Sequence, residues 1–477
     1  MRAAEVAVKI LESEGVDVAF GIPGAGINPF YKYLGQSNQI KHYIARHEEG
    51  AAHAAIGYAR ASGKMACCVA TSGPAATNFV TGLYTAQIDS IPIVAITGQN
   101  VRAQLGKESF QCVDIATIAR PVVKGSWCIT EPARLPGIMR EAFRIARQGR
   151  PGPILIDLPL DVQMEEIDYD PDLDAPLAWE NPKPDPKKIE RAIEMILASQ
   201  SPVILLGGGV ILSGATEELR QFAEYLSIPV VTTYMGKGGM SPDHPLYCGQ
   251  VGIQCNTPFG NRAFLQSDLV LGVGCRFSDR HTGGLATYTR GRKFIHVDVE
   301  PTQIGRIIPA DLGIVSDAKL ALEALLEAAR ERTAKREAAG WVADIPTLRE
   351  ESARFLDYDG WPIKPQRLFA EINRFFDDDA IFTVGCGLVQ IWSGQFQKIS
   401  KPGRYLQSGG AGTLGYEVPA AVGAKIAKPE ATVCSIVGDG GFSFRGEELA
   451  MACHYGIPIV VVVLNNGYLS LIRQNQK

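Results

Sequence analysis

The chain has 477 residues, a length typical of about three domains. Hydrophobic residues make up 46% of it and charged residues 21%, with a net charge of -4, so the composition is that of an ordinary globular protein. No block rich in Lys and Arg occurs, so neither nucleic acid nor a membrane is an expected partner. The ten cysteines form no C-x-x-C pair, and the N-terminus leads directly into an amphipathic pattern. We therefore expect reduced, mostly buried thiols, no signal peptide and a cytoplasmic location.

The first 166 residues alternate short apolar runs with helical patterns. The expected strands are Val16–Phe20, Met65–Ala70, Ile91–Thr97 and Ile154–Leu158. The expected helices lie near 3–14, 48–61, 75–86 and 132–147. This alternation predicts an α/β domain with a parallel sheet over residues 1–166.

A segment rich in proline and aspartate, 167–187, interrupts the pattern and is expected to be a linker. Two further sets of strands follow it. A second domain over 188–330 is expected to contain strands Pro202–Leu206, Leu269–Val273 and Phe294–Val299, with a long helix near 318–339. A third domain over 360–477 is expected to contain strands Ala380–Val384, Thr432–Val437 and Ile457–Leu464. The sequence thus predicts three doubly wound parallel-sheet domains, the last C-terminally incomplete because little chain follows its last strand.

The strongest motif is Gly438-Asp439-Gly440, followed after 441–464 by Asn465-Asn466. Its two halves follow two expected strands, whose carboxyl ends meet at one edge of a parallel sheet, so Asp439 and Asn466 are expected to converge there. Two side-chain oxygens suit Mg²⁺, and the glycines allow a diphosphate to approach the backbone. The alternative is two unrelated turns, because both short sequences are common in turns.

With this motif in place, the chain resembles the acetohydroxyacid synthase group of thiamine diphosphate (ThDP) enzymes, and within it the glyoxylate carboligases. The supporting stretches are Gly21–Tyr31, Gly149–Val162, Gly291–Asp317 and Leu469–Gln476. The resemblance implies a pyrimidine-binding, a central and a diphosphate-binding domain, with the backbone carbonyl of Tyr468 as a third magnesium ligand. It also assigns cofactor-binding positions to Gly24, Ala25, Gly387, Leu388, Gly412, Gly438, Gly440 and Gly441.

Glu48, in Arg46-His47-Glu48-Glu49-Gly50, resembles the glutamate that activates ThDP in this family. A carboxylate beside the aminopyrimidine ring assists removal of the thiazolium C2 proton. The alternative is a carboxylate that favours the first turn of a helix, a role that Glu49 fits better. Glu48 also departs from the glyoxylate carboligases, which have valine there, and agrees with the acetolactate synthases.

Several residues resemble groups on the substrate side of the site. Leu414 resembles the apolar residue that supports the bent cofactor, although a core leucine is the alternative. Phe110 and Gln111 resemble a pair that enters the site beside the reacting carbon. Arg280 resembles the arginine that holds the acceptor's carboxylate, with a surface ion pair as the alternative.

Three positions distinguish the two substrate classes. Asn475 stands where acetolactate synthases have tryptophan, and Leu160 where they have lysine. Leucine at 414 also follows the carboligase pattern, whereas acetolactate synthases usually have methionine. We therefore expect glyoxylate to be joined to glyoxylate, giving tartronate semialdehyde and CO2, with pyruvate and acetolactate as the alternative.

The central domain carries a second candidate ligand site. Gly207-Gly208-Gly209 follows one expected strand, and Asp298 ends another, where a carboxylate can bind a ribose. The resemblance implies FAD in a structural role, with Asp317, Arg276 and Gly252 as further contacts. The alternative is the ADP portion of a coenzyme A substrate, as in oxalyl-CoA decarboxylases.

The resemblance also predicts how the chain assembles. It implies a homodimer or tetramer, in which Glu48 of one subunit faces the cofactor held by the third domain of its neighbour. A non-catalytic binding or regulatory member of the same fold is the remaining alternative. The presence of Glu48, Asp439 and Asn466 together argues against that alternative.

Overall fold

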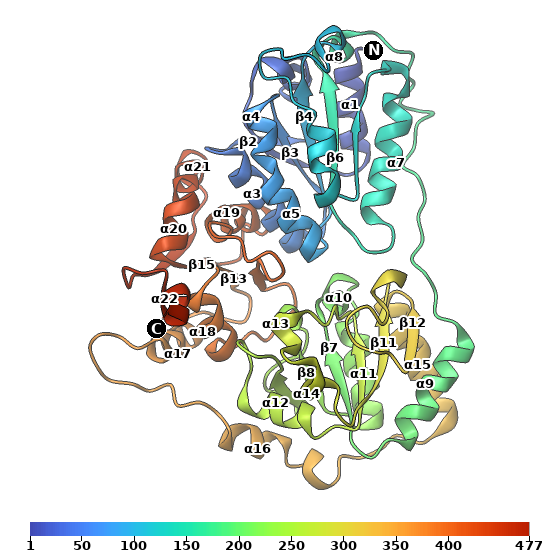
Figure 1. Cartoon of the computed structure of the whole chain (residues 1–477), viewed down its shortest axis with the longest axis vertical. Coiled ribbons are helices and arrows are strands. Elements are labelled where there is room, and N and C mark those ends of the chain that lie inside the picture. Colours follow the sequence, from blue (N-terminus) through green and yellow to red (C-terminus); the bar gives the residue numbers. More distant parts are fainter. Residues whose placement is uncertain (477) are drawn as a thin grey trace. The chain divides into compact units, whose positions relative to one another are not determined.

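The computed structural model describes residues 1–476 and divides the chain into two compact units (Figure 1). The first unit contains Met1–Glu180, Ile381–Gly387 and the residues from Leu406 onward, and the second contains Asn181–Ala380 and Leu388–Tyr405. Three parallel sheets are distributed over the two units, which confirms the predicted fold class. The last residue of the expected third domain, 477, lies outside the described residues.

The first sheet belongs to the first unit and has the strand order β2-β1-β3-β4-β6-β5, with parallel pairing throughout. Its strands are β1 (Val18–Gly21), β2 (Lys41–Ile44), β3 (Ala66–Ala70), β4 (Ile93–Gln99), β5 (Gly125–Cys128) and β6 (Ile154–Pro159). The central strand β3 is buried along its whole length, as a parallel strand covered on both faces must be. Cys67 and Cys68 therefore point into opposite layers of the core as small apolar side chains.

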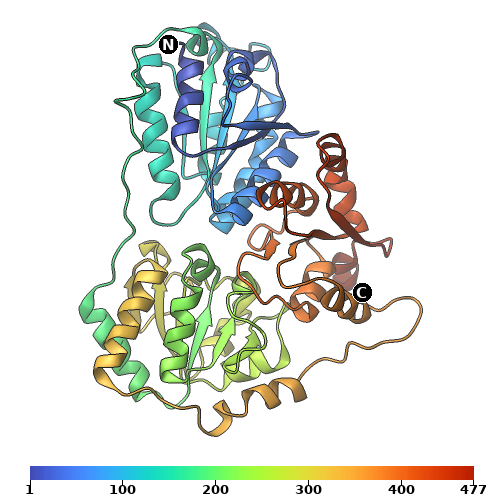
Figure 2. The same ribbon diagram turned by 180° about the vertical axis from the view of Figure 1, so that it is seen from behind.

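Helices cover both faces of this sheet (Figures 1 and 2). One layer contains α1 (Ala3–Ser13), α2 (Asn28–Leu34) and α7 (Leu135–Arg147). The other layer contains α3 (Glu48–Ser62) and α5 (Phe79–Asp89). The short helices α4 (Pro74–Thr77), α6 (Ile115–Ala119) and α8 (Leu160–Met164) complete the domain. The expected crossover helices are thus present, although the stretch near 75–86 is divided between α4 and α5.

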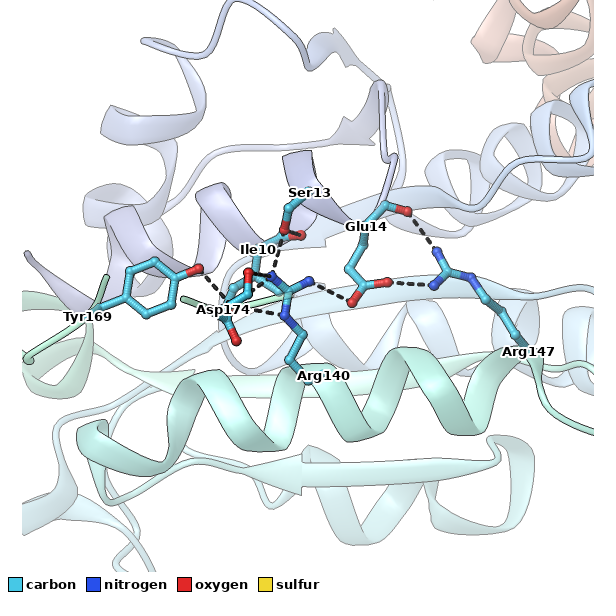
Figure 3. A network of polar contacts seen from close by, with 7 residues as sticks. All are labelled: Ile10, Ser13, Glu14, Arg140, Arg147, Tyr169 and Asp174. Atoms are coloured by element: carbon cyan, nitrogen blue, oxygen red, sulfur yellow. Dashed lines mark hydrogen bonds and ion pairs between the residues drawn. The ribbon is translucent and has the colours of Figure 1, made fainter. Parts of the chain in front are cut away.

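A buried polar network ties the start of the linker to the first domain (Figure 3). Arg140 of α7 donates to Oε1 of Glu14 at 2.7 Å and to Oδ2 of Asp174 at 2.6 Å. Glu14 also pairs with Arg147, and the Tyr169 hydroxyl donates to Asp174. Among the described residues, the chain between α8 and α9 (Pro186–Ala198) contains no helix or strand, and the first unit ends within it at Glu180.

The second sheet has the order β12-β11-β10-β7-β8-β9 and is also parallel. Its strands are β7 (Pro202–Leu206), β8 (Val230–Thr232), β9 (Tyr247–Gln250), β10 (Leu269–Val273), β11 (Lys293–Asp298) and β12 (Leu312–Val315). One face packs on α9, α10 (Gly208–Leu212), α11 (Thr216–Leu226) and α15 (Ala318–Arg332). The other packs on α12 (Pro258–Leu265), α14 (Leu285–Thr289) and α16 (Ile345–Glu351). The second unit also contains α13 (Asp279–Thr282), α17 (Pro365–Phe375) and α18 (Leu388–Phe396).

The third sheet has the order β14-β13-β15-β16. Its strands are β13 (Ile381–Val384), β14 (Tyr405–Gln407), β15 (Val433–Gly438) and β16 (Val460–Leu464). The helices of this domain that belong to the first unit are α19 (Glu417–Ala427), α20 (Asp439–Arg445), α21 (Leu449–His454) and α22 (Ser470–Gln476). Helix α19 packs closely on α3 of the first domain. A Cβ at Gly57 would lie 2.1 Å from the Ala420 carbonyl oxygen, and one at Gly423 would lie 1.9 Å from that of Ala54. Only glycine allows these backbones to approach so closely.

Some boundaries differ from the sequence predictions. The last strand begins at Val460 rather than Ile457, because Pro458 lacks the amide hydrogen that a strand needs. The helix predicted near 318–339 ends at Arg332, and the chain beyond it is held by hydrogen bonds to Tyr225. Strands β5, β8, β9, β12 and β14, each of three or four residues, were not predicted. Over residues 1–476, none of the helices combines the length and the apolar character needed to cross a membrane.

Candidate active site

Asp439 and Asn466 lie together at the carboxyl edge of the third sheet. Strands β15 and β16 run parallel, and Gly438 is paired with Leu464 at their ends. Asp439 follows the first strand directly and begins α20, and Asn466 lies two residues beyond the second. The amide of Asn466 donates to Oδ1 of Asp439 at 3.4 Å. The predicted convergence of these two residues is therefore confirmed, while their role as metal ligands stays a prediction.

The oxygen atoms around this pair form a compact group. Oδ1 of Asn466 accepts from the Tyr468 amide at 3.2 Å and from the Ser470 hydroxyl at 2.8 Å. The same hydroxyl lies 3.2 Å from the Tyr468 carbonyl oxygen, to which it donates. A carboxylate, an amide oxygen and a backbone carbonyl are the donor set that Mg²⁺ prefers, so these residues fit that ion.

Glycines border this edge of the sheet. Gly387 and Gly412 have φ angles of 101° and 64°, a region that favours glycine. A Cβ at Gly387 would meet open space, whereas one at Gly440 would lie 2.7 Å from Leu469 and one at Gly441 would lie 2.6 Å from Oε1 of Glu417. A side chain at Gly441 would thus crowd the buried Glu417, whereas the exposed Leu469 side chain can move away from Gly440. Gly387 leaves room for a ligand to approach its backbone. The half-buried Leu414 follows Gly412 in the loop before α19.

Glu48 begins α3 and is only 9% exposed. Its Oε2 accepts a hydrogen bond of 2.9 Å from the Asn78 side chain. Glu49 has a different environment, because it forms an ion pair with Arg445 and lies 3.4 Å from the buried ring of His53. Burial acts to raise the pKa of Glu49, but His53 and Arg445 outweigh it and lower the pKa below its usual value. Glu49 therefore forms a structural ion pair, whereas the side-chain partner of Glu48 is a neutral amide.

Three buried carboxylates of the first unit, those of Glu448, Asp89 and Glu417, were not predicted from the sequence. Glu448 accepts hydrogen bonds from the amides of Arg46 and His47, directly before Glu48. Asp89 accepts from the amides of Gly409 and Gly410 in the loop before Leu414. Neither oxygen of Glu417 has a side-chain or backbone hydrogen bond of good geometry, and burial raises its pKa to about 7. Contacts between residues so distant in sequence leave no local pattern that could have revealed them.

Phe110 and Gln111 lie on an exposed loop of the first unit. Phe110 is 85% exposed, and its carbonyl oxygen accepts from the Asn100 side chain. Gln111 has a φ angle of 55°, which is uncommon for a residue other than glycine and is concentrated at functional sites. Its side chain occupies the space that a Cβ at Gly73 would fill, 2.7 Å away. This conformation was not predicted, and it gives Gln111 a defined direction.

The remaining predicted positions in the first unit have mixed environments. Gly24 packs against Thr71, where a Cβ would lie 2.6 Å from the Thr71 Cβ, and Ala25 begins the short 3-10 helix Ala25–Ile27. Leu160 begins α8 and is half-buried, while Asn475 is exposed on α22. The structure thus gives Gly24 a packing role and leaves the substrate-side roles of Leu160 and Asn475 as predictions.

Arg280 of the second unit lies on α13 and is held by two amide side chains. Its Nη2 donates to Oε1 of Gln390 on α18 at 2.7 Å and to Oε1 of Gln254 at 3.3 Å. Gln390 lies two residues beyond Leu388 on the same helix. These neutral partners orient the guanidinium without neutralising its charge, so it can still bind a carboxylate.

The proposed nucleotide-binding residues of the central domain include several with packing roles. A Cβ at Gly207 would lie 2.1 Å from the Gly274 carbonyl oxygen, so close backbone packing already requires glycine there. Asp317 caps α15 by accepting from the amides of Lys319 and Leu320. Asp298 is nearly buried at the end of β11, where its Oδ1 accepts from the Glu300 amide.

The other members of this group are positioned as follows. Gly208 and Gly209 begin α10 after β7. The Gly252 amide donates to Asn261, and the Arg276 carbonyl oxygen accepts from Gln303. Gly252 has a φ angle of 154°, and a Cβ there would have no neighbour closer than 3.7 Å. A nucleotide contact at these residues stays a prediction.

Comparison with known proteins gives the same three-part organisation. Residues 1–118 match the N-terminal TPP binding domain of thiamine pyrophosphate enzymes, residues 189–325 their central domain, and residues 385–477 their C-terminal TPP binding domain. A glyoxylate carboligase from Escherichia coli O157:H7 is 47% identical over all of this chain and 81% of its own length. A probable acetolactate synthase large subunit from Methanococcus aeolicus is 42% identical over all of this chain and 82% of its own length. An acetolactate synthase large subunit from Corynebacterium glutamicum is 42% identical, with 76% of its length covered.

Thiamine pyrophosphate is another name for ThDP. These matches therefore confirm the predicted resemblance to the ThDP enzymes. The family domains extend over most of the chain, and both expected classes of relative are present. The strand ends that bring Asp439 and Asn466 together lie within the matched C-terminal domain. The chain therefore belongs to the thiamine pyrophosphate enzyme family, in the group of the glyoxylate carboligases and acetolactate synthases.

Proposed function

We propose that this chain is a ThDP-dependent carboligase that joins two molecules of glyoxylate into tartronate semialdehyde and releases CO2. The observation that carries the proposal is the convergence of Asp439, Asn466 and Tyr468 at the ends of β15 and β16. The relative from Escherichia coli, named glyoxylate carboligase, supports the choice of reaction. Release of CO2 from glyoxylate by the purified protein with ThDP and Mg²⁺ is the direct test. A non-catalytic subunit would release none.

The proposed cofactor site uses residues of the third domain. Mg²⁺ would be held by the side chains of Asp439 and Asn466 and by the carbonyl oxygen of Tyr468. The backbone of Gly438, Gly440 and Gly441 would bind the diphosphate, as glycines before a helix do in other phosphate sites. Further proposed contacts are Gly24, Ala25, Gly387, Leu388 and Gly412. Bound ThDP supplies the carbon nucleophile that a 2-oxo acid requires and accepts the electron pair released with CO2.

The protein's own residues would supply orientation and proton transfer. Glu48 would hold a proton at N1' of the cofactor's pyrimidine ring, where a carboxylate can act as a proton shuttle. Leu414 would support the bent cofactor from beneath. Phe110 and Gln111 would border the reacting carbon, and Arg280 would hold the acceptor's carboxylate. The buried position of Glu48 and the neutral partners of Arg280 support these roles.

The choice of glyoxylate rests on Leu414, Asn475 and Leu160, which follow the carboligase pattern at three positions. Glu48 follows the acetolactate synthase pattern, but it concerns cofactor activation rather than substrate shape. Acetolactate synthase activity with pyruvate is the second candidate, because relatives of that name are 42% identical to the chain. The two substrates differ by one methyl group, which a pocket distinguishes by only about 1–3 kcal/mol. Product analysis with each acid alone and with both together separates the candidates, and a clear preference for pyruvate in kcat/KM would establish the second.

A flavin in the central domain is part of the proposal. It would be FAD in a structural role, near Gly207, Gly208 and Gly209 and with Asp298 at a ribose. Gly252, Arg276 and Asp317 are further proposed contacts. The support is the resemblance and the nearly buried carboxylate at the end of β11. A flavin absorption spectrum of the purified protein tests it, and coenzyme A or ADP in its place would favour an acyl-CoA decarboxylase.

The proposed active form is a homodimer or tetramer in the cytoplasm, with small 2-oxo acids as the other partners. The proposal follows the family resemblance, in which Glu48 of one subunit faces the cofactor of the next. Sedimentation of the active protein tests it. An active monomer would contradict the shared site.

A further inference from the structure

Two buried carboxylates of the first unit each bind backbone amides of the opposite domain. Glu448, from the third domain, accepts from the amides of Arg46 and His47 in the first domain at 3.0 and 2.9 Å. Asp89, from the first domain, accepts from the amides of Gly409 and Gly410 in the third domain at 3.0 and 2.8 Å. We propose that these residues form a pair of reciprocal clamps that position the Glu48 turn and the Leu414 loop. The inference rests on the proposed function for the roles of Glu48 and Leu414.

The Glu448 clamp fixes the turn that immediately precedes Glu48. Glu448 is 0% exposed, and its second oxygen also lies 3.2 Å from the Arg46 amide. A Cβ at Gly50 would lie 2.2 Å from its Oε1, so the carboxylate fills the space against the first turn of α3. Because the bonded His47 amide belongs to the residue before Glu48, a shift of this carboxylate would move the start of the helix.

The Asp89 clamp fixes the loop that leads to Leu414. Asp89 ends α5 and is 5% exposed. One helical turn earlier, the Thr85 hydroxyl lies 2.7 Å from that of Thr413, the residue before Leu414. Within the loop, the amide of Thr413 donates to the Ser408 hydroxyl at 3.1 Å. The first domain therefore holds both ends of the segment from Gly409 to Thr413.

The two clamps fix the conformation of the Glu48 turn and of the Leu414 loop, and they are not what holds the two domains together. The close packing of α3 on α19 already joins the two domains through Gly57 and Gly423. Each carboxyl group accepts from the amides of two successive residues, so it adds a directional restraint at its turn. Glu448 and Asp89 are positioning residues, because each acts through a turn and neither is placed against the cofactor.

Hydrogen exchange of the apoprotein tests the clamps without cofactor. Glu448→Ala is expected to increase amide exchange in peptides covering 44–50 at least tenfold, with 408–415 unchanged. Asp89→Ala is expected to do the reverse. Glu448→Gln keeps one acceptor oxygen, which can serve both amides as Oε1 does, and should recover most of the protection. Asp89→Asn keeps only one of the two oxygens in use and should recover part of it. Glu430→Ala is the control, because Glu430 is an exposed carboxylate of the same domain. Unchanged exchange in both peptides, or an equal increase over the whole unit, would overturn the proposal.

Cofactor measurements test the consequence of each clamp. Glu448→Ala should slow exchange of the C2 proton of bound ThDP at least tenfold and change the Kd for ThDP with Mg²⁺ by less than threefold. Asp89→Ala should weaken that Kd at least tenfold, as measured by tryptophan fluorescence. Equal effects of the two variants on both readouts would contradict separate positioning roles. Absence of ThDP binding by the unaltered protein would overturn the proposed function alone, because the exchange experiment does not depend on the cofactor.

Discussion

The backbone amide of Asn466 donates a hydrogen bond to Oδ1 of Asp439, although 27 positions separate the two residues. Their meeting follows from the parallel pairing of β15 and β16, which brings the carboxyl ends of the two strands to one edge. The oxygen of Asn466 is in turn bonded to the Tyr468 amide, so all three proposed ligands belong to one group.

Asp439→Ala is expected to abolish stable binding of ThDP with Mg²⁺, because it removes the only carboxylate among the proposed ligands. Loss of a residue that merely supports a ligand costs about 10–100-fold in metal affinity, so loss of a ligand should exceed about 100-fold. Isothermal titration with ThDP and Mg²⁺ measures it. Asp378→Ala is the control, since Asp378 is exposed. Normal cofactor binding by the Asp439 variant would show that the metal site lies elsewhere.

Glu48→Val is expected to slow exchange of the C2 proton of bound ThDP by about 10²–10⁴-fold, the range typical of an acid–base group. Affinity for ThDP should change little, because the diphosphate and metal contacts are unaltered. NMR of the bound cofactor after dilution into deuterated buffer measures the exchange. An unchanged rate would mean that Glu48 is only a carboxylate at the start of a helix.

Glu417→Gln is expected to stabilise the protein at high pH. Burial raises the pKa of Glu417 to about 7, so the folded state retains a proton that the unfolded chain loses near its ordinary pKa of 4.5. The stability linked to this proton is complete below pH 4.5 and is lost as the pH rises through about 7. The free energy of unfolding falls by up to about 3 kcal/mol over this pH range.

Calorimetric unfolding of the apoprotein at pH 5 and pH 8 compares Glu417→Gln with the unaltered chain. Glu448 and Asp157 also have pKa values raised to about 7 by burial, and their contribution is present in both proteins. The variant should therefore be the more stable protein at pH 8 and differ less at pH 5. The same pH dependence in both would show that Glu417 is not the titrating group.

Arg140→Met is expected to destabilise the first domain by about 3 kcal/mol. The buried Arg140 pairs with both Glu14 and Asp174, and the change removes this cation from both carboxylates. Arg144→Met is the matched control on the same helix. Arg144 pairs with Glu141 at the surface, where an ion pair contributes less than about 1 kcal/mol. Urea unfolding followed by far-UV circular dichroism measures both variants. Equal effects would mean that the network in Figure 3 adds nothing beyond a surface ion pair.

Local sequence patterns were sufficient to predict the main strands of the three sheets. Apolar runs such as Leu269–Val273 and Met65–Ala70 became buried strands close to their predicted bounds, because parallel strands covered on both faces are largely apolar. The glycines and polar residues after β15 and β16 likewise predicted that Asp439 and Asn466 lie together, since ligand groups in such sheets follow the strand ends. Short strands such as β8 were missed because three residues carry too little periodicity.

Only the tertiary structure showed the partners of these carboxylates. In the sequence, Glu48 and Glu49 are neighbours of the same type, and helix-start chemistry cannot separate them. The fold buries Glu48 and partly buries Glu49; it pairs Glu49 with the cation of Arg445 and Glu48 with the neutral amide of Asn78. Asp89 and Glu448 have no local pattern at all, because the amides that they bind lie more than three hundred residues away in the chain. Local periodicity reports burial and strand ends, whereas the partner of a buried charge is set by packing between distant segments.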